Sequence, residues 1–216
     1  MKTAVQLDFD GTVTEEDVSF LLLDTYVGSR WREYLKEYSA GRISVGAFNK
    51  KAFGMVKADM KTMTDLVLNS DRVKIRPGLR DYLDYCSQKG IKNVIVSNGL
   101  IFYIEAILKK LGLNGVEVYA ARNRFHPGGL EVAYIGPDGA ELEVGFKEAY
   151  TELLKKRGFD VVYVGNGASD IFSARRASHV FAVDELLKRC RREKVPCTPF
   201  TDFYDIIKGL EALANG

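Results

Sequence analysis

The stretch VQLDFDGTVTEEDVSF, residues 5–20, ends a short apolar run with two aspartates and a glycine. Side chains alternate between the two faces of a β-strand, so Asp8 and Asp10 can serve one site only if the chain bends into a loop after Phe9. Gly11 permits that bend, because glycine adopts backbone angles that other residues avoid. The stretch therefore predicts a buried strand that delivers two acids to the loop behind it.

Two carboxylates at the end of a buried strand carry a desolvation cost, which a bound divalent cation would offset. Carboxylate oxygens are hard ligands and favour Mg²⁺. The alternative interpretation is a helix N-cap followed by a turn. It explains one of the two aspartates but not the pair.

Apolar runs of strand length recur along the chain and alternate with segments of helical period. The strand candidates are residues 4–9, 93–97, 161–165 and 180–183. The clearest helical stripes are Ile101, Ile104, Leu108 and Leu111, then Phe203, Ile206, Leu210 and Leu213. This alternation predicts an α/β fold with a mostly parallel sheet, whose strand-end loops gather along one rim.

Two segments interrupt the alternation. Residues 15–75 contain no convincing strand and carry helical patterns at 18–25, 43–55 and 60–68, so we expect an inserted helical subdomain. Residues 116–145 alternate in polarity around two turn signals, HPGG at 126–129 and GPDG at 136–139. They predict a small antiparallel hairpin excursion beside the sheet.

The composition limits the classes of function. A chain of 216 residues with 46% hydrophobic residues can bury the core of one large domain, or of a core domain with a smaller insertion. A formal net charge of +2 gives no overall attraction to nucleic acid or membranes, and the basic run at 188–194 is expected on a solvated helix face. No apolar stretch approaches the roughly 18 residues of a membrane span, and the first apolar run is too short for a signal peptide. We therefore expect a cytoplasmic protein that binds neither nucleic acid nor membrane.

The three cysteines, Cys86, Cys190 and Cys197, are too few for a disulfide framework and lack metal-ligand spacing. Reduced structural thiols are the expected state. Pairing of Cys190 with Cys197 across a turn stays open as an alternative.

A second polar strand end lies in NVIVSNG, residues 93–99. It would deliver Ser97 to the same rim, with Asn98 and Gly99 opening a helix whose free N–H groups can hold an anion. A serine before a helix is more often a simple N-cap, so this signal is weak alone.

Two more strand or helix ends add to the pattern. The stretch EVGFKEAY, residues 143–150, puts Lys147 at a helix start, which is unfavourable for a cation unless an anion lies beside it. The stretch VVYVGNGASDIF, residues 161–172, ends a strand at Gly165 and then offers Asn166 and Asp170 as oxygen ligands. A lone aspartate there would again be read as a helix cap.

Taken in order, these stretches resemble the four motifs of the haloacid-dehalogenase-like phosphohydrolase superfamily. The motifs are DFDGT at 8–12, Ser97 in VSNG, Lys147, and GNGASD at 165–170. The resemblance implies a three-layer, Rossmann-like parallel sheet core at residues 1–14 and 76–216. It also implies that residues 15–75 form an inserted helical cap of the first type (C1).

The resemblance also implies roles. Asp8 would be the nucleophile that takes up the phosphoryl group, and Asp10 would protonate the leaving group and later deprotonate water. Thr12 would support the loop geometry. Phosphate would be bound by Ser97, Asn98, Gly99 and Lys147, and Mg²⁺ by Asp8, the backbone carbonyl of Asp10, Asn166 and Asp170.

One position departs from the family pattern. The family commonly has aspartate where this chain has Asn166, so a carboxylate ligand is replaced by a neutral amide. We expect weaker Mg²⁺ binding, or a larger share for Asp170. In the second case Asp170→Asn lowers Mg²⁺ affinity more than Asn166→Ala does.

Within the superfamily the chain looks most like the phosphoserine-phosphatase-like branch, and in it the methylthiopentenyl phosphate phosphatase group of methionine salvage. In the phosphoserine enzymes an acid at the position of Asp17 reads the substrate ammonium and a cap arginine reads its carboxylate. Lys50 falls where that arginine would be, and lysine lacks the bidentate fork that suits a carboxylate, which disfavours phosphoserine as substrate.

The function implied is Mg²⁺-dependent hydrolysis of a small phosphorylated metabolite through an aspartyl-phosphate. A phosphotransferase or phosphomutase would share every motif, and a phosphoryl-accepting regulator would need similar residues, although a cap suits a diffusible substrate better. A dehalogenase would keep Asp8 without needing Asp10 or a metal site. A binding module without catalysis is the remaining alternative.

Overall fold

A single seven-stranded sheet organises the computed structural model, which describes residues 2–215. Its strand order is β4-β3-β2-β1-β5-β6-β7, and every neighbouring pair is parallel except β3 and β4. The strands are β1 (Lys2–Leu7), β2 (Lys92–Leu100), β3 (Glu117–His126), β4 (Gly129–Ala133), β5 (Phe159–Gly165), β6 (His179–Ala182) and β7 (Thr198–Pro199).

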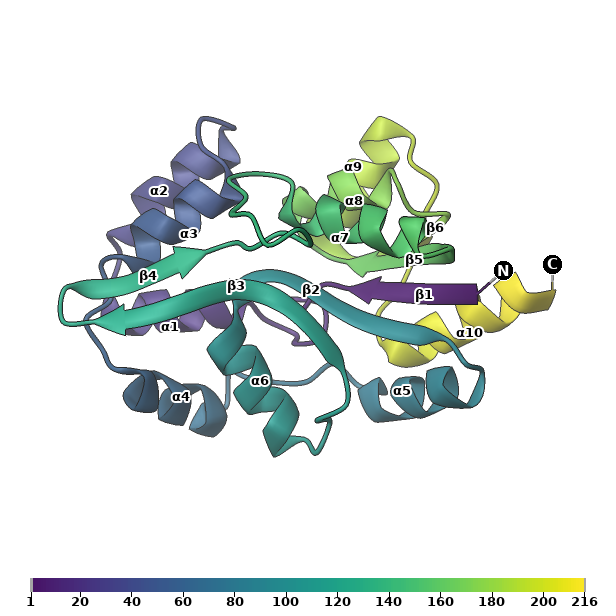
Figure 1. Ribbon diagram of the computed structural model, residues 1–216, viewed down its shortest axis with the longest axis horizontal. Helices are drawn as coiled ribbons and strands as arrows, with labels where there is room; N and C mark the ends of the chain where they lie inside the picture. The colour runs from purple at the N-terminus through teal and green to yellow at the C-terminus, as the bar shows by residue number, and fades with distance from the viewer. Residues whose placement is uncertain (1, 216) are drawn as a thin grey trace.

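Helices cover both faces of this sheet (Figure 1). One side carries α5 (Leu79–Gln88), α6 (Ile101–Lys110) and α10 (Phe203–Asn215). The other carries α7 (Phe146–Lys156), a short 3₁₀ turn η1 (Ala168–Asp170), α8 (Ile171–Ala174) and α9 (Asp184–Glu193). The expected three-layer α/β architecture is thereby confirmed.

The strands form where the apolar runs predict them. The four predicted runs correspond to β1, β2, β5 and β6, and the inner residues of these strands are buried, as parallel strands covered on both faces must be. The edge strand β7 has only two residues and was not foreseen, since a strand that short leaves no periodic signal.

Four helices fill the segment between β1 and α5, as the absence of strand patterns indicated. They are α1 (Val18–Tyr26), α2 (Trp31–Ser39), α3 (Val45–Phe53) and α4 (Met60–Asn69), and we call them the cap helices. Thr14 and Ile75 form an isolated antiparallel bridge, and Glu15 N donates to Lys74 O at 2.9 Å. The chain thus leaves the sheet and returns to it at neighbouring points.

The predicted hairpin is present, but it extends the main sheet. The first half of β3 pairs with β2, and its second half pairs with β4 across the HPGG turn, where His126 lies opposite Gly129. The hairpin packs against α3 of the cap (Figure 1). A Cβ on Gly129 would lie 2.3 Å from the carbonyl oxygen of Gly54, so the two backbones are in close contact.

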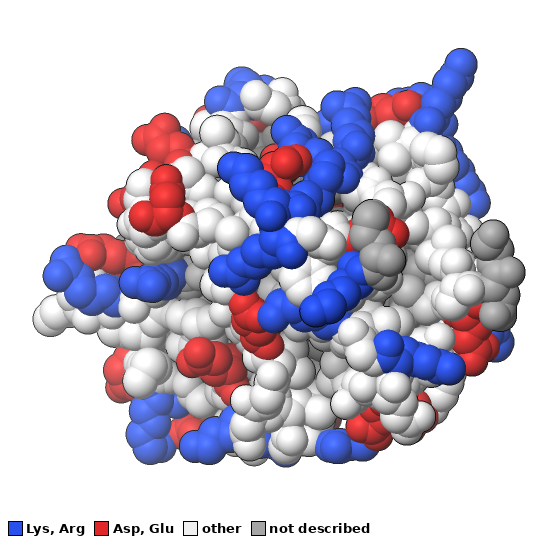
Figure 2. All heavy atoms as spheres, turned by 45° about the vertical axis from the view of Figure 1, so that its right-hand side comes forward, with Lys and Arg blue, Asp and Glu red and all other residues white. Residues whose placement is uncertain are grey.

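Lys188, Arg191 and Arg192 of the basic run are exposed on α9, as expected, whereas Arg189 is partly buried and Lys194 follows the helix. Leu186 and Cys190 of α9 are buried. Figure 2 turns the right-hand side of Figure 1, where α9 lies, toward the viewer and shows many Lys and Arg side chains there. Arg175, Arg189 and Arg192 all approach Glu193. All three cysteines are free thiols, and no helix within residues 2–215 is long and apolar enough to cross a membrane.

Candidate active site

The ends of β1, β2 and β5 meet below the cap helices, and the predicted polar residues gather there. They line a cavity of about 320 Å³, which we call the inner cavity. The predicted residues in its wall are Asp8, Asp10, Asp17, Ser97, Asn98, Gly99, Lys147 and Asn166. Motifs separated by up to 158 positions in sequence, from Asp8 to Asn166, are therefore brought together at one rim.

The two aspartates reach the inner cavity from a bend after β1. The strand ends at Leu7, but Asp8 N still donates to Val164 O at 2.9 Å. Gly11 has φ +74°, and a Cβ there would lie 2.1 Å from Asn166 Nδ2. Glycine is required both by this backbone angle and by the close approach of Asn166.

Two side chains hold the bend. The Thr12 hydroxyl donates to Asn166 Oδ1 at 3.1 Å, which ties the first motif to the last. From the other side, Arg76 donates to the carbonyl oxygens of Thr12 (2.9 Å), Gly11 (2.8 Å) and Thr201 (2.8 Å). The loop that carries the acids is therefore fixed by two other parts of the chain, Asn166 and Arg76, and Thr201 in turn holds Arg76.

Lys147 is buried between two carboxylates. Its Nζ lies 2.6 Å from Asp8 Oδ1 and 2.6 Å from Asp170 Oδ1. Burial alone lowers the pKa of Lys147, but Asp170 and Asp8 outweigh it and raise the pKa above its usual value. The anions expected beside this cation at the start of α7 are these two side chains.

Asp170 is fully buried and accepts four hydrogen bonds. Its Oδ1 accepts from Lys147 Nζ and from Tyr163 Oη at 2.7 Å. Its Oδ2 accepts from the backbone N–H groups of Asn166 (3.0 Å) and Gly167 (2.8 Å). Asp170 does not line the inner cavity, so its contacts favour a role in holding Lys147 and the loop after β5.

Asp10 and Asp8 differ in their surroundings. Burial, followed by the charge of Asp17, raises the pKa of Asp10 to about 8. Burial, followed by Asp170, raises the pKa of Asp8 to about 7, because the nearby Lys147 offsets part of the effect. Asp8 lies against the Lys147 ammonium, which favours its ionised form, whereas Asp10 accepts from the Tyr103 hydroxyl and from Val18 N.

The end of β2 differs from the prediction. Ser97 is buried, and its Oγ accepts from Gly99 N at 3.0 Å. The expectation that Asn98 and Gly99 open the next helix is wrong, since β2 continues to Leu100 and α6 begins at Ile101. A register irregularity between Ser97 and Leu100 makes room for the two intervening residues without ending the strand.

The donors available to a cation are oxygens. Within residues 2–215 no group of three or more His, Cys, Asp and Glu side chains is placed to hold a metal ion. Asp8 Oδ1 already contacts Lys147 and accepts from Phe9 N at 2.7 Å, and Asn166 Oδ1 accepts from Thr12. A carboxylate and an amide oxygen in one wall fit a hard cation such as Mg²⁺, with less negative charge than a set of carboxylates would supply.

The two predicted substrate residues have different outcomes. Asp17 lines the inner cavity and caps α1, where its Oδ1 accepts from Phe20 N at 3.0 Å; burial raises the pKa of Asp17 to about 6. Lys50 is placed away from the cavity and lies 2.5 Å from Glu141. Helix α3 turns by about 100° per residue, so it presents the neighbouring Asn49 to the cavity instead.

Asn49 belongs to a junction that sequence reasoning missed. Its Nδ2 donates to Asn98 O at 2.9 Å and to Tyr134 Oη at 2.6 Å. Tyr134 Oη in turn donates to Asn98 O at 2.8 Å. Sequence reasoning also missed Arg76 and Tyr103, whose Oη donates to Asp10 Oδ2. A tyrosine inside an apolar helical stripe is a usable signal, because its buried hydroxyl needs a partner.

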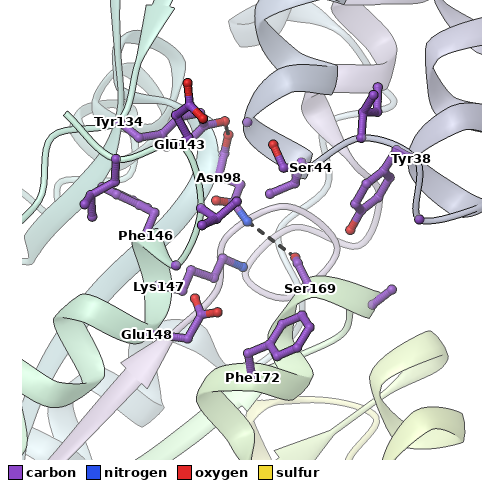
Figure 3. Close-up of a pocket in the computed structure, with 18 of the residues that line it drawn as sticks. Tyr38, Ser44, Asn98, Tyr134, Glu143, Phe146, Lys147, Glu148, Ser169 and Phe172 are labelled. Carbon is purple, nitrogen blue, oxygen red and sulfur yellow. Dashed lines mark hydrogen bonds between the residues drawn. The ribbon is translucent and has the colours of Figure 1, made fainter.

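A second, larger space opens beside the inner cavity (Figure 3). This outer cavity has a volume of about 940 Å³ and lies between the cap helices and residues 142–148. Asn98, whose Nδ2 donates to Ser169 Oγ at 3.3 Å, stands at the boundary of the two cavities. The apolar residues in the wall of the outer cavity are Ile43, Val45, Leu142, Val144, Phe146 and Phe172.

The cations of the outer cavity are already paired. Arg189 Nε lies 2.9 Å from Glu193, and its Nη1 donates to Ala168 O at 2.8 Å. Arg192 lies 3.7 Å from the same glutamate. Glu143, Glu148 and Glu185 also line the outer cavity, although most of its wall surface is apolar.

Comparisons with known proteins support the family resemblance carried by the motifs. A family model of haloacid dehalogenase-like hydrolases matches residues 5–175. A 2-hydroxy-3-keto-5-methylthiopentenyl-1-phosphate phosphatase of Geobacillus thermodenitrificans is 28% identical over 211 residues, covering 95% of this chain and 94% of that protein. One of the same name from Exiguobacterium sibiricum is 29% identical over 215 residues, covering 98% and 97%.

Solved structures show the same architecture. A substrate-bound phosphoserine phosphatase superposes with a TM-score of 0.74 at 22% sequence identity, covering 96% of this chain and 98% of that one. At this identity the likeness concerns the fold.

Proposed function

The chain belongs to the haloacid dehalogenase-like hydrolases, and from that premise we propose that it is a phosphatase of a small phosphorylated metabolite. The observation that carries the proposal is the buried Lys147, 2.6 Å from Asp8 Oδ1 in the wall of the inner cavity. A cation beside a buried carboxylate favours its ionised form and attracts an anionic ester.

Asp8 is the proposed nucleophile. As it attacks, the bond between phosphorus and the ester oxygen breaks and a bond between phosphorus and an Asp8 oxygen forms. Asp10, whose pKa is raised by burial and which accepts from a hydroxyl and a backbone N–H, gives its proton to the departing oxygen. Asp10 then takes a proton from the water that hydrolyses the aspartyl-phosphate, and both acids return to their starting state.

Phosphate binding is assigned to the predicted set that lines the inner cavity. Lys147 supplies a full positive charge, and Ser97 supplies a hydroxyl. Asn98 and Gly99 lie on the irregular end of β2, where backbone groups leave the ladder of the sheet. These donors would neutralise the phosphoryl oxygens as the charge shifts during transfer.

Mg²⁺ is the proposed cofactor, held by Asp8, Asn166 and the backbone carbonyl of Asp10. Bound there, it would screen the repulsion between an anionic nucleophile and an anionic phosphate. The sequence left two alternatives open, weaker Mg²⁺ binding or a larger share for Asp170. Because four protein donors already contact that side chain, we now assign the larger share to Asn166.

The substrate is proposed to be a phosphomonoester with an apolar body. The relatives at 28% and 29% identity are named for 2-hydroxy-3-keto-5-methylthiopentenyl-1-phosphate, and the apolar outer cavity suits its methylthio chain. Phosphoserine fits less well, since Lys50 is paired with Glu141 and the outer-cavity arginines with Glu193. A cytoplasmic location goes with such a substrate.

A phosphotransferase or phosphomutase remains the second candidate, because the same residues would pass the phosphoryl group to an alcohol instead of water. The two are separated by adding a competing alcohol, such as glycerol, and measuring inorganic phosphate against transferred phosphate. A phosphoryl-accepting regulator would instead accumulate the aspartyl-phosphate without turnover.

The test is a panel of phosphomonoesters, including the methylthiopentenyl ester, assayed with and without Mg²⁺. Wild-type protein is expected to release phosphate only with Mg²⁺, and Asp8→Asn to lose about 10³-fold or more, since the nucleophile is removed. Asp65→Asn, an exposed change on α4, is the matched control and should leave turnover unchanged. Turnover by Asp8→Asn at the wild-type rate would refute the proposed function.

A further inference from the structure

Tyr103 places a hydroxyl against the acid of the proposed reaction. The side chain comes from α6 on the core side and is fully buried. Its Oη donates to Asp10 Oδ2 at 2.5 Å and lies 2.9 Å from Ser19 Oγ of α1. The hydroxyl therefore joins a core helix, a cap helix and the acid.

Asp10 is held at both of its oxygens. Oδ1 accepts from Val18 N at 3.0 Å, while Oδ2 accepts from Tyr103. The last torsion of an aspartate side chain has a broad energy profile, so a single donor leaves the carboxyl plane free to turn. Two donors from different helices fix that plane.

The backbone at Gly99 lies directly against the Tyr103 hydroxyl and the Asp10 carboxyl group. A Cβ on Gly99 would lie 2.0 Å from Tyr103 Oη and 2.2 Å from Asp10 Oδ2. The strand end that carries Ser97 thus packs directly on the hydrogen bond between Tyr103 and Asp10. Loss of the hydroxyl would leave space and an unpaired carboxyl oxygen next to the proposed phosphate site.

We propose that Tyr103, supported by Ser19, is a positioning residue that aims the Asp10 proton at the ester oxygen. The role rests on the proposed phosphatase function. In the step concerned, the phosphorus–oxygen ester bond breaks, phosphorus bonds to Asp8, and the Asp10 proton moves to the ester oxygen so that an alcohol leaves. Tyr103 keeps its own proton throughout.

The positioning role of Tyr103 can be tested by comparing phosphate esters whose leaving groups differ in basicity. An alkoxide is too basic to depart without a proton, whereas p-nitrophenolate is a stable anion and departs without one. The ratio kcat/KM covers only the steps up to phosphoryl transfer, so the later attack of water, common to both esters, does not enter it. A residue that aims the proton should therefore matter for an alkyl ester and not for the aryl ester.

The experiment compares kcat/KM for glycerol 2-phosphate and p-nitrophenyl phosphate, both with Mg²⁺. Tyr103→Phe is expected to lose about tenfold or more on the alkyl ester and less than about threefold on the aryl ester, as a general-acid contribution of about 10²–10⁴ permits. Ser19→Ala should show the same pattern with a smaller loss. Tyr82→Phe removes another buried tyrosine hydroxyl, bonded to Asn93 on the core side, and should change neither value.

Each other result has a distinct meaning. Equal losses on both esters would mean that Tyr103 only maintains the shape of the site, and would overturn the positioning role while leaving the phosphatase intact. Unchanged activity of Tyr103→Phe on both esters would overturn it as well. If wild-type protein hydrolysed neither ester, nor any other in the panel, the proposed function itself would fall and this role with it.

Discussion

At the scale of single residues, the two aspartates of the first motif are separated by their partners. Asp8 contacts a buried ammonium, whereas Asp10 contacts a hydroxyl and a backbone N–H and lies near the charge of Asp17. A cation favours the ionised carboxyl, and a neighbouring anion favours the protonated one. These contacts support the proposed division of roles, with Asp8 as the nucleophile and Asp10 as the acid.

Asn166 is the residue on which the proposed Mg²⁺ site can be tested. It lines the inner cavity, while Asp170 is enclosed by protein donors. We expect Asn166→Asp to lower the Mg²⁺ concentration needed for half-maximal activity and Asn166→Ala to raise it. Asp170→Asn should reduce kcat with a smaller change in that concentration, because it loosens Lys147.

The measurement is a Mg²⁺ titration of phosphate release by each variant. Asn69→Asp, an exposed amide-to-acid change on α4, controls for the added charge. A larger shift for Asp170→Asn than for Asn166→Ala would restore Asp170 as the main ligand.

The identity of most site residues was predictable, and their partners were not. Residue type and position after an apolar run placed Asp8, Ser97 and Lys147 correctly at one rim. The sequence had no means of showing that Lys50 would face Glu141, since one helical position changes the direction of a side chain by about 100°. Nor did spacing reveal Tyr103, which contacts Asp10 across 93 positions.

At the scale of elements, the loop after β1 depends on the segments that flank it. Arg76, just before α5, binds three carbonyl oxygens, two in that loop and one at Thr201 before α10. Its guanidinium also lies over the Phe200 ring at 5.4 Å. The C-terminal stretch TPFTDFYDI, residues 198–206, therefore holds Arg76 against the loop.

Arg76→Lys should loosen this loop, because an ammonium cannot reach three carbonyl groups in the geometry of a guanidinium fork. We expect the free energy of unfolding to fall by about 1–3 kcal/mol, which is the range for losing hydrogen bonds to a charged group and leaving their partners unpaired. We also expect kcat to fall. Chemical denaturation and steady-state kinetics measure the two effects. Arg80→Lys, which alters an arginine bound to the Leu111 carbonyl, is the control, and equal behaviour of the two variants would contradict the assignment.

Element boundaries were less predictable than element types. The strand–helix alternation was correct, yet β2 extends to Leu100 because the irregularity at Asn98 and Gly99 keeps the chain in the sheet. Such a bulge depends on packing against Tyr103 and Asp10, which lie on other elements. The local sequence pattern around Asn98 and Gly99 cannot predict contacts with residues on other elements.

At the scale of the whole molecule, the cap helices contact the rest of the fold at several places. The chain crosses to them at the paired residues Thr14 and Ile75, the hairpin packs on α3, and α4 packs on α6. Asn49 adds a polar link from the cap to Asn98 at the boundary of the two cavities. The inner cavity is therefore enclosed by segments from both parts of the fold, which accounts for the raised pKa values of its acids.

These raised values make stability depend on pH. The pKa of Asp10 rises from an ordinary 3.8 to about 8, and that of Asp8 to about 7, so near neutral pH the folded protein holds protons that the unfolded chain has released. Stability then falls as pH increases, by at most about 1.4 kcal/mol per group and pH unit. Burial lowers the pKa of His179, so at more acidic pH this histidine makes stability rise with pH instead. The window to examine is therefore pH 6.5 to 8.5.

We expect the Tm of the metal-free protein, measured in EDTA, to fall across that window, by about 2–4 °C for each kcal/mol lost. Asp10→Asn should show a shallower fall and a higher Tm than wild type at pH 8.5, because an amide does not titrate and its oxygen can still accept from Val18 N. Asp65→Asn, exposed on α4, should keep the wild-type slope. If Asp10→Asn also kept it, Asp10 would ionise as readily in the folded protein as in the unfolded chain, and its assignment as the proton-holding acid would have to be abandoned.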